Sequence, residues 1–179
     1  YKRQDMYLAS MPEMGEWFGS PASMIQLTLT AYMVGMALGQ FLLGPLSDVL
    51  GRHKLMVTGN LIFLLASGGI IVAPDIHWVL ALRFVQGLAG AAGVVIARAM
   101  VSDIAHGHRA AQLYSVLALI TSLAPVVAPL AGGVIATVAD WRVVFWVLAI
   151  FGAVMLACSV FIVPETLPPG QRSRGGLGR

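Results

Sequence analysis

Long apolar stretches separated by short polar links dominate the pattern of the chain. At a rise of about 1.5 Å per residue, a helix of about 20 apolar residues crosses the roughly 30 Å hydrocarbon core of a bilayer. The apolar stretches are Ala22–Leu46, Leu55–Ala73, Ile76–Val101, Ala110–Val138 and Val143–Val163. The links between them are Ser47–Lys54, Pro74–Asp75, Ser102–Arg109 and Ala139–Arg142. The pattern therefore predicts five membrane-spanning helices, and the short links require neighbouring helices to be antiparallel.

The apolar stretches are continuous and do not alternate with a period of two, which argues against membrane β-strands. Composition agrees, because 58% of the residues are hydrophobic and 11% are charged, and the mean hydropathy is +0.84. In soluble domains about a quarter of the residues are charged. We therefore exclude a soluble enzyme, a disordered chain and a nucleic-acid-binding protein. We expect an all-α polytopic membrane bundle.

The two ends of the chain differ from the apolar middle. Residues 1–18 resemble the last part of a further helix, and a full span does not fit there because few residues precede Asp5 and two of them are Lys2 and Arg3. Residues 19–163 hold the five predicted spans. Residues 164–179 are rich in Pro, Gly and Arg, a composition typical of a linker or tail. Both ends lead us to expect a fragment of a longer protein.

The distribution of Lys and Arg predicts the orientation in the membrane. Two alternate links and the tail, which fall on one side, carry six basic residues: Arg52, Lys54, Arg109, Arg172, Arg174 and Arg179. The other side carries one, Arg142, beside several acidic residues. Because cytoplasmic loops are enriched in Lys and Arg, we expect the Ser47–Lys54 and Ser102–Arg109 links and the tail to face the cytoplasm of a bacterial inner membrane.

Two ionisable residues fall at membrane depth, where a charge costs at least a few kcal/mol and marks a functional site by default. Asp5 would lie about two turns from Pro12, and a carboxylate there can bind a proton or pair with a cationic substrate. The alternative is that Asp5 caps a short segment at the interface. Arg83, with Gln86 on the same helical face, is a fixed cation that can keep a neighbouring carboxylate ionised. The alternative is an arginine that snorkels to the interface.

Small residues at four-residue spacing predict close packing between helices. One such stripe comprises Ala31, Gly35 and Gly39, and another comprises Ala124, Ala128 and Gly132. The second stripe also contains Pro125 and Pro129, ahead of Gly132 and Gly133. Prolines remove backbone hydrogen bonds, so this segment is predicted to bend, either as a hinge or as a static kink.

Other chemistries find no support in the sequence. The four histidines lie in links or at helix ends, so they offer no buried metal pair, and we see no nucleophile with a base and no phosphate-binding loop. The single cysteine, Cys158, excludes a disulfide framework or a cysteine metal cluster. We therefore expect no catalytic residues, no metal and no bound cofactor. A channel would need a ring of filter residues, for which there is no candidate.

Four motifs resemble those of one transporter family. Gly44 to Lys54 reads GPLSDVLGRHK, and it resembles the signature G-x-L-x-D-R-x-G-R-R/K of the major facilitator superfamily. Arg83 to Gly87 reads RFVQG, similar to the R-x-x-Q-G pattern of the fourth helix in that superfamily. Ala124 to Gly133 reads APVVAPLAGG, similar to the fifth-helix pattern of proton-coupled drug antiporters. Asp5 to Leu8, with Pro12 beyond, resembles the first-helix signature D-x-Y-L-P of the Bcr/CflA group of drug-resistance exporters, which includes phenicol and bicyclomycin exporters.

The resemblance implies a fold and a function. Members have twelve helices in two six-helix halves, and this chain matches the N-terminal half with its first helix truncated. Members of the drug-exporting group exchange protons moving inward for drug moving outward, so the driving force is the proton gradient. The implied partners are a small-molecule drug, protons, the lipid bilayer and the C-terminal half.

The resemblance also implies roles for the motif residues. Asp5, Arg83 and Gln86 match positions for proton and substrate coupling. The cytoplasmic gate is matched by Gly44, Asp48, Gly51, Arg52 and Lys54. Asp103, an acid at the end of the fourth helix, completes this group. The positions that match the bend of the antiporter helix are Pro125, Pro129, Gly132 and Gly133.

The chain departs from the family pattern at several positions. Val49 stands where the signature has arginine, and His53 replaces a common second basic residue, so either the gate is weaker or its cytoplasmic anchoring depends on Lys54. Lys2 and Arg3 do not suit a first membrane helix. Two other functions therefore stay open: a metabolite transporter of the same superfamily, and an inactive remnant or half-transporter that needs a partner half.

Overall fold

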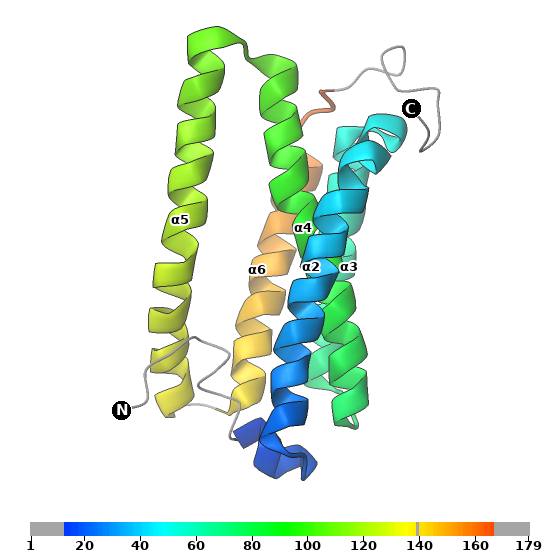
Figure 1. Ribbon diagram of the computed structural model, residues 1–179, viewed down its shortest axis with the longest axis vertical. Coiled ribbons are helices and arrows are strands. Elements are labelled where there is room, and N and C mark those ends of the chain that lie inside the picture. The colour runs from blue at the N-terminus through cyan, green and yellow to red at the C-terminus, as the bar shows by residue number, and fades with distance from the viewer. Residues whose placement is uncertain (1–12, 139, 167–179) are drawn as a thin grey trace.

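The computed structural model describes residues 13–138 and 140–166, and for residues 124–138 it describes the backbone alone. These ranges contain long helices and no strand, which confirms the predicted all-α fold. The helices, labelled as in Figure 1, are α2 (Ala22–Leu50), α3 (Arg52–Ile71), α4 (Ile76–Ile104), α5 (Gly107–Val138) and α6 (Trp141–Phe161). Within the described ranges, α2, α3, α4 and α6 are long and apolar enough to cross a membrane.

Successive helices run in opposite directions, as the short links require (Figure 1). The α2–α3 link, the α4–α5 link and the end of α6 lie at one end of the bundle, which we call the Arg52 end. The α3–α4 link and the start of α6 lie at the opposite end, which we call the Trp141 end. Residues 13–18 are also helical and lie at the Trp141 end, where Met14 is buried against Ile25 and Trp141.

Three of the four links are shorter than the polar pattern predicts, whereas the α3–α4 link, residues 72–75, is longer than the predicted Pro74–Asp75. Helix α2 continues through polar residues to Leu50 and α3 begins at Arg52, so Gly51 alone separates them. Gly51 has φ 99°, a backbone conformation that residues with a Cβ rarely adopt, and it breaks the helix at this point. The polar residues on either side stay helical because their side chains find partners in the cluster described below.

At the Trp141 end, acidic side chains begin two helices. The Asp75 carboxylate accepts a hydrogen bond from the backbone N–H of Trp78, and that of Asp140 accepts one from Arg142. A carboxylate at this position satisfies an unpaired donor and suits the positive end of the helix dipole. Asp75 and Asp140, which lie on the side of the bundle with few basic residues, therefore also cap helices.

Helices α2 and α4 approach so closely that their backbones touch. A Cβ atom built on Gly35 would lie 2.2 Å from the carbonyl oxygen of Phe84, and one on Gly87 would lie 2.1 Å from that of Tyr32. On Gly39 the corresponding distance to the Leu88 carbonyl oxygen is 2.6 Å. The prediction that the stripe with Gly35 and Gly39 packs closely against another helix is therefore confirmed.

Helix α6 packs along α3. Between them the Asn60 amide donates a hydrogen bond of 2.5 Å to the Ser159 hydroxyl. At the Trp141 end, Nε of Arg142 donates to the carbonyl of Ile71, near the end of α3. Polar contacts of this kind hold membrane helices together where the hydrophobic effect does not.

The outward surface of the bundle is apolar. Large side chains are more than half exposed on α2, α3, α5 and α6, for example Phe41, Leu65, Leu119 and Ile150. An apolar surface of this extent requires lipid or further protein to cover it. The apolar outward surface therefore agrees with a bundle that lies in a membrane.

The close approach of α2 and α4 leads to a testable prediction. Gly87→Ala places a methyl group against the backbone of Tyr32, so we expect it to destabilise the bundle by at least about 2 kcal/mol, because backbone can yield only by moving a helix. The matched control is Gly93→Ala in the same helix, where a Cβ meets no atom within 4 Å. Thermal unfolding in detergent checks both variants, and equal midpoints would contradict the prediction.

Candidate functional site

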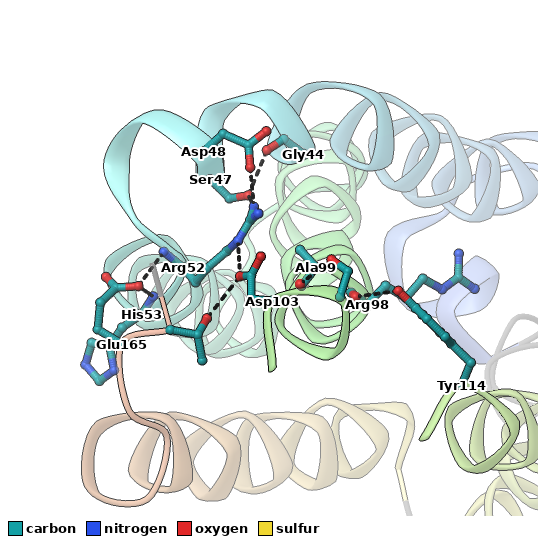
Figure 2. Close-up of polar contacts among 12 residues, drawn as sticks. Gly44, Ser47, Asp48, Arg52, His53, Arg98, Ala99, Asp103, Tyr114 and Glu165 are labelled. Atoms are coloured by element: carbon teal, nitrogen blue, oxygen red, sulfur yellow. Dashed lines mark hydrogen bonds and ion pairs between the residues drawn. The ribbon is translucent and has the colours of Figure 1, made fainter. Parts of the chain in front are cut away.

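A cluster of charged and polar side chains joins three helices at the Arg52 end (Figure 2). We call it the Arg52 cluster: Ser47 and Asp48 from α2, Arg52 from α3 and Asp103 from α4. The guanidinium makes ion pairs with Asp48, at 2.6 Å from Nη1 to Oδ1, and with Asp103, at 3.1 Å from Nε to Oδ2. Nη1 also donates to the Ser47 hydroxyl, which itself donates to the carbonyl of Gly44. One arginine thus binds all three helices.

The one-residue link produces this geometry. Because Gly51 ends α2 and precedes α3, Asp48 in the last turn of α2 lies next to Arg52 in the first turn of α3. Asp103 reaches the same point from the last turn of α4. The guanidinium suits such a position because its fixed fork of donors can meet two carboxylates at once.

The Arg52 cluster is largely shielded from water. The side chains of Arg52 and Asp103 are 9% and 19% exposed, whereas that of Asp48 is 48% exposed. Removing one partner of such a shielded ion pair leaves a poorly solvated charge and is strongly destabilising. The cluster can therefore favour one arrangement of α2, α3 and α4 over others.

The structure brings together most of the residues that the sequence assigns to the gate. Asp48, Arg52 and Asp103 contact one another, Gly51 supplies the turn, and Gly44 accepts a hydrogen bond. Lys54 is exposed, and its side chain takes no part in the hydrogen bonds and ion pairs of the Arg52 cluster that are described above.

Sequence reasoning missed the segment that follows α6. Residues 163–166 contact the first turn of α3 and Asp103, although the composition places residues 164–166 in a linker-like tail. One signal was available: the direction of the helices places the end of α6 at the same end of the bundle as Arg52. Glu165 and Thr166 are the first polar residues after that apolar helix.

A second cluster surrounds Arg83 in the interior of the bundle. We call it the Arg83 cluster: Arg83 and Gln86 from α4, Ser67 from α3, Tyr32 from α2 and Phe145 from α6. The Arg83 Nη1 donates to the Gln86 side-chain oxygen at 3.0 Å. The Gln86 amide then donates to the Ser67 hydroxyl at 2.7 Å, and that hydroxyl donates to the carbonyl of Phe63.

Aromatic faces complete the surroundings of Arg83. Its Cζ lies 4.7 Å from the centre of the Phe145 ring and 5.7 Å from that of Tyr32, within the range of a cation–π interaction. Arg83 is 5% exposed and Gln86 is fully buried. The side chain is therefore packed between helices and does not snorkel to the interface.

Several predicted site residues lie where the structure gives no side-chain geometry. Asp5 lies outside the described residues. Pro125, Pro129, Gly132 and Gly133 lie in the part of α5 for which the backbone alone is described, and that backbone is helical. The predicted coupling role of Asp5 and the predicted bend stay predictions. Among the residues that the structure describes, no group of His, Cys, Asp and Glu is arranged to hold a metal ion.

Comparison with known proteins identifies a matching family model and several relatives of the chain. Residues 4–178 match the Major Facilitator Superfamily model. The chain is 39% identical over 97% of its length to YdgK, a transporter of the same type from Bacillus subtilis. It is 36% identical over 90% to a bicyclomycin resistance protein homolog from Haemophilus influenzae, and 38% identical over 87% to a chloramphenicol resistance protein from Pseudomonas aeruginosa.

A solved structure supports the fold. The human organic anion transporter MFSD10 matches with a TM-score of 0.73 and 22% identity, over 94% of this chain and 40% of that one. The chain spans 44%, 41% and 36% of the lengths of the three bacterial relatives. The helical architecture, the family model and the relatives agree, and the chain belongs to the major facilitator superfamily.

Proposed function

We propose that this chain forms the first six-helix half of a proton-coupled drug exporter of the bacterial inner membrane. The observation that carries the proposal is the Arg83 cluster, a buried guanidinium at the point where α2, α3, α4 and α6 meet. Burying a charge at membrane depth is costly, and proteins keep such a charge mainly where it serves ion or substrate movement. The names of the bicyclomycin and chloramphenicol resistance relatives support a drug as the substrate.

The proposed coupling acid is Asp5. A fixed cation favours the ionised form of a nearby carboxylate, and proton binding neutralises that carboxylate. Exchange of a proton for a drug at one carboxylate would link inward proton flow to outward drug movement. In this scheme Gln86 and Ser67 hold the guanidinium in place, and the energy comes from the proton gradient without a bound cofactor.

The Arg52 cluster is the proposed gate. In alternating access the two halves rock around a central site, so one end of the protein closes while the other opens. An ion-paired cluster at the boundary between membrane and water can stabilise one of these states and separate in the other. We assign the Arg52 end to the cytoplasm, because Arg52, Lys54 and Arg109 lie there.

The coupling proposal is tested by Asp5→Asn in a twelve-helix protein that contains this chain. We expect drug export driven by a pH gradient to be lost, because the amide cannot bind and release a proton, while the protein still reaches the membrane. The measurement is export of a phenicol and of bicyclomycin from cells that lack other exporters. The matched control is Glu16→Gln, which changes an exposed acid at the Trp141 end.

Unchanged pH-driven export by Asp5→Asn would refute the coupling role. If the unaltered protein moves neither drug and instead alters the uptake of a metabolite, the alternative of a metabolite transporter is favoured. If it moves nothing unless a separate second half is supplied, the half-transporter alternative is favoured.

The gate proposal is tested by Arg52→Lys. Lysine keeps the charge, but its single ammonium group cannot reproduce the guanidinium contacts with Asp48 and Asp103 together. We expect lower thermal stability and lower export, and a coupling free energy with Asp103→Asn of about 1 kcal/mol or more in a double-mutant cycle. The control is Arg109→Lys, an exposed arginine at the same end. Additive effects of Arg52→Lys and Asp103→Asn would contradict the gate geometry.

A further inference from the structure

The segment that follows α6 crosses to the Arg52 cluster instead of leaving the bundle directly. We call residues Val163–Thr166 the strap. Figure 2 shows Glu165 of the strap beside His53 and Arg52 at the start of α3. The strap comes from a part of the chain more than 100 residues away from that helix, since Arg52 and Glu165 are 113 positions apart.

Glu165 caps α3. Its Oε1 accepts hydrogen bonds from the backbone N–H of Arg52, at 3.0 Å, and from that of His53, at 3.4 Å. These N–H groups belong to the first turn of the helix, where no carbonyl within the helix can accept them. A carboxylate also suits the positive end of the helix dipole. The Glu165 side chain therefore fixes the backbone position from which the Arg52 side chain extends.

Two further contacts hold the strap in place. The His53 Nδ1 is 2.7 Å from the carbonyl oxygen of Val163, so it carries the proton and donates to that oxygen. The Thr166 hydroxyl donates to Oδ2 of Asp103 at 3.2 Å. The same oxygen accepts from Arg52 Nε at 3.1 Å, so the strap contacts both members of this ion pair.

We propose that Glu165 is a positioning residue and that the strap latches the Arg52 cluster in its closed arrangement. The carboxylate holds the first turn of α3 so that the guanidinium reaches Asp48 and Asp103, and Thr166 holds Asp103 toward it. The consequence for transport rests on the proposed function, whereas the latch itself is a property of the described residues.

A buried thiol can report on the latch. Ser47 is fully buried under the Arg52 side chain, so the thiol introduced by Ser47→Cys, in a Cys158→Ser background, is shielded while the Arg52 cluster is closed. Labelling by a membrane-permeant maleimide in isolated membranes measures how often the cluster opens. A second reporter, Ser67→Cys, is equally buried but lies in the Arg83 cluster.

Glu165→Ala should raise the labelling rate at position 47 on the order of fivefold, the factor that corresponds to about 1 kcal/mol for a lost helix cap. The rate at position 67 should stay unchanged. Glu165→Gln should give a smaller rise, because the amide oxygen can still accept both N–H bonds. The matched control is Glu13→Ala, since Glu13 accepts from the backbone N–H of Trp141 at the opposite end of the bundle. It should leave position 47 shielded.

Three results would overturn the latch: no change at position 47 with Glu165→Ala, an equal rise at both reporters, or an equal rise with Glu13→Ala. The labelling needs neither drug nor proton gradient, so its result stands even if the unaltered protein exports nothing. Faster labelling at position 47 with unchanged drug export would leave the latch in place and refute the gate role of the Arg52 cluster.

Discussion

The contact between α2 and α4 is the constraint on which both polar clusters depend. Gly35, Gly39 and Gly87 let the two backbones meet with no side chain between them. Each cluster then spans this contact. Tyr32 of α2 faces Arg83 of α4 in the interior, and Asp48 of α2 reaches the same guanidinium as Asp103 of α4 at the Arg52 end. A wider separation would pull both sets of partners apart.

The protein treats its two buried arginines differently. Arg52, close to water, is paired with carboxylates, of which Asp48 remains half exposed. Arg83, deep between helices, is bound by a neutral amide and by aromatic faces in the described contacts. The described contacts of Arg83 therefore come from uncharged groups, whereas those of Arg52 include two carboxylates. The Arg52 contacts join helix ends at one end of the bundle, and the Arg83 contacts join helices in its interior.

The sequence predicted the parts of this structure that follow from periodicity and from local motifs. The helices and the close packing at Gly35 depend on spacing within one segment, whereas the grouping of Asp48, Arg52 and Asp103 was implied by the resemblance to a family signature. The strap could not be predicted, because Glu165 meets Arg52 through a contact between distant segments and its surroundings in sequence resemble a linker. The α2–α3 link was predicted to be too long, because polar residues such as Ser47 and Arg52 count as link residues in a hydropathy pattern although they are helical. Tyr32 and Phe145 were not assigned to the Arg83 cluster, since aromatic residues in an apolar helix carry no sign of which neighbour they face.

Gly51 has a consequence for the rotational phase of α3. Because only one residue separates the helices, the end of α2 determines the rotation of α3 about its own axis. One additional residue in α3 just after this joint would turn everything beyond it by about 100° and shift it by about 1.5 Å. Asn60 would then face away from Ser159 and Ser67 away from Gln86. The length of this joint therefore sets the rotation of the whole of α3, and a change in chain length there displaces every contact beyond it.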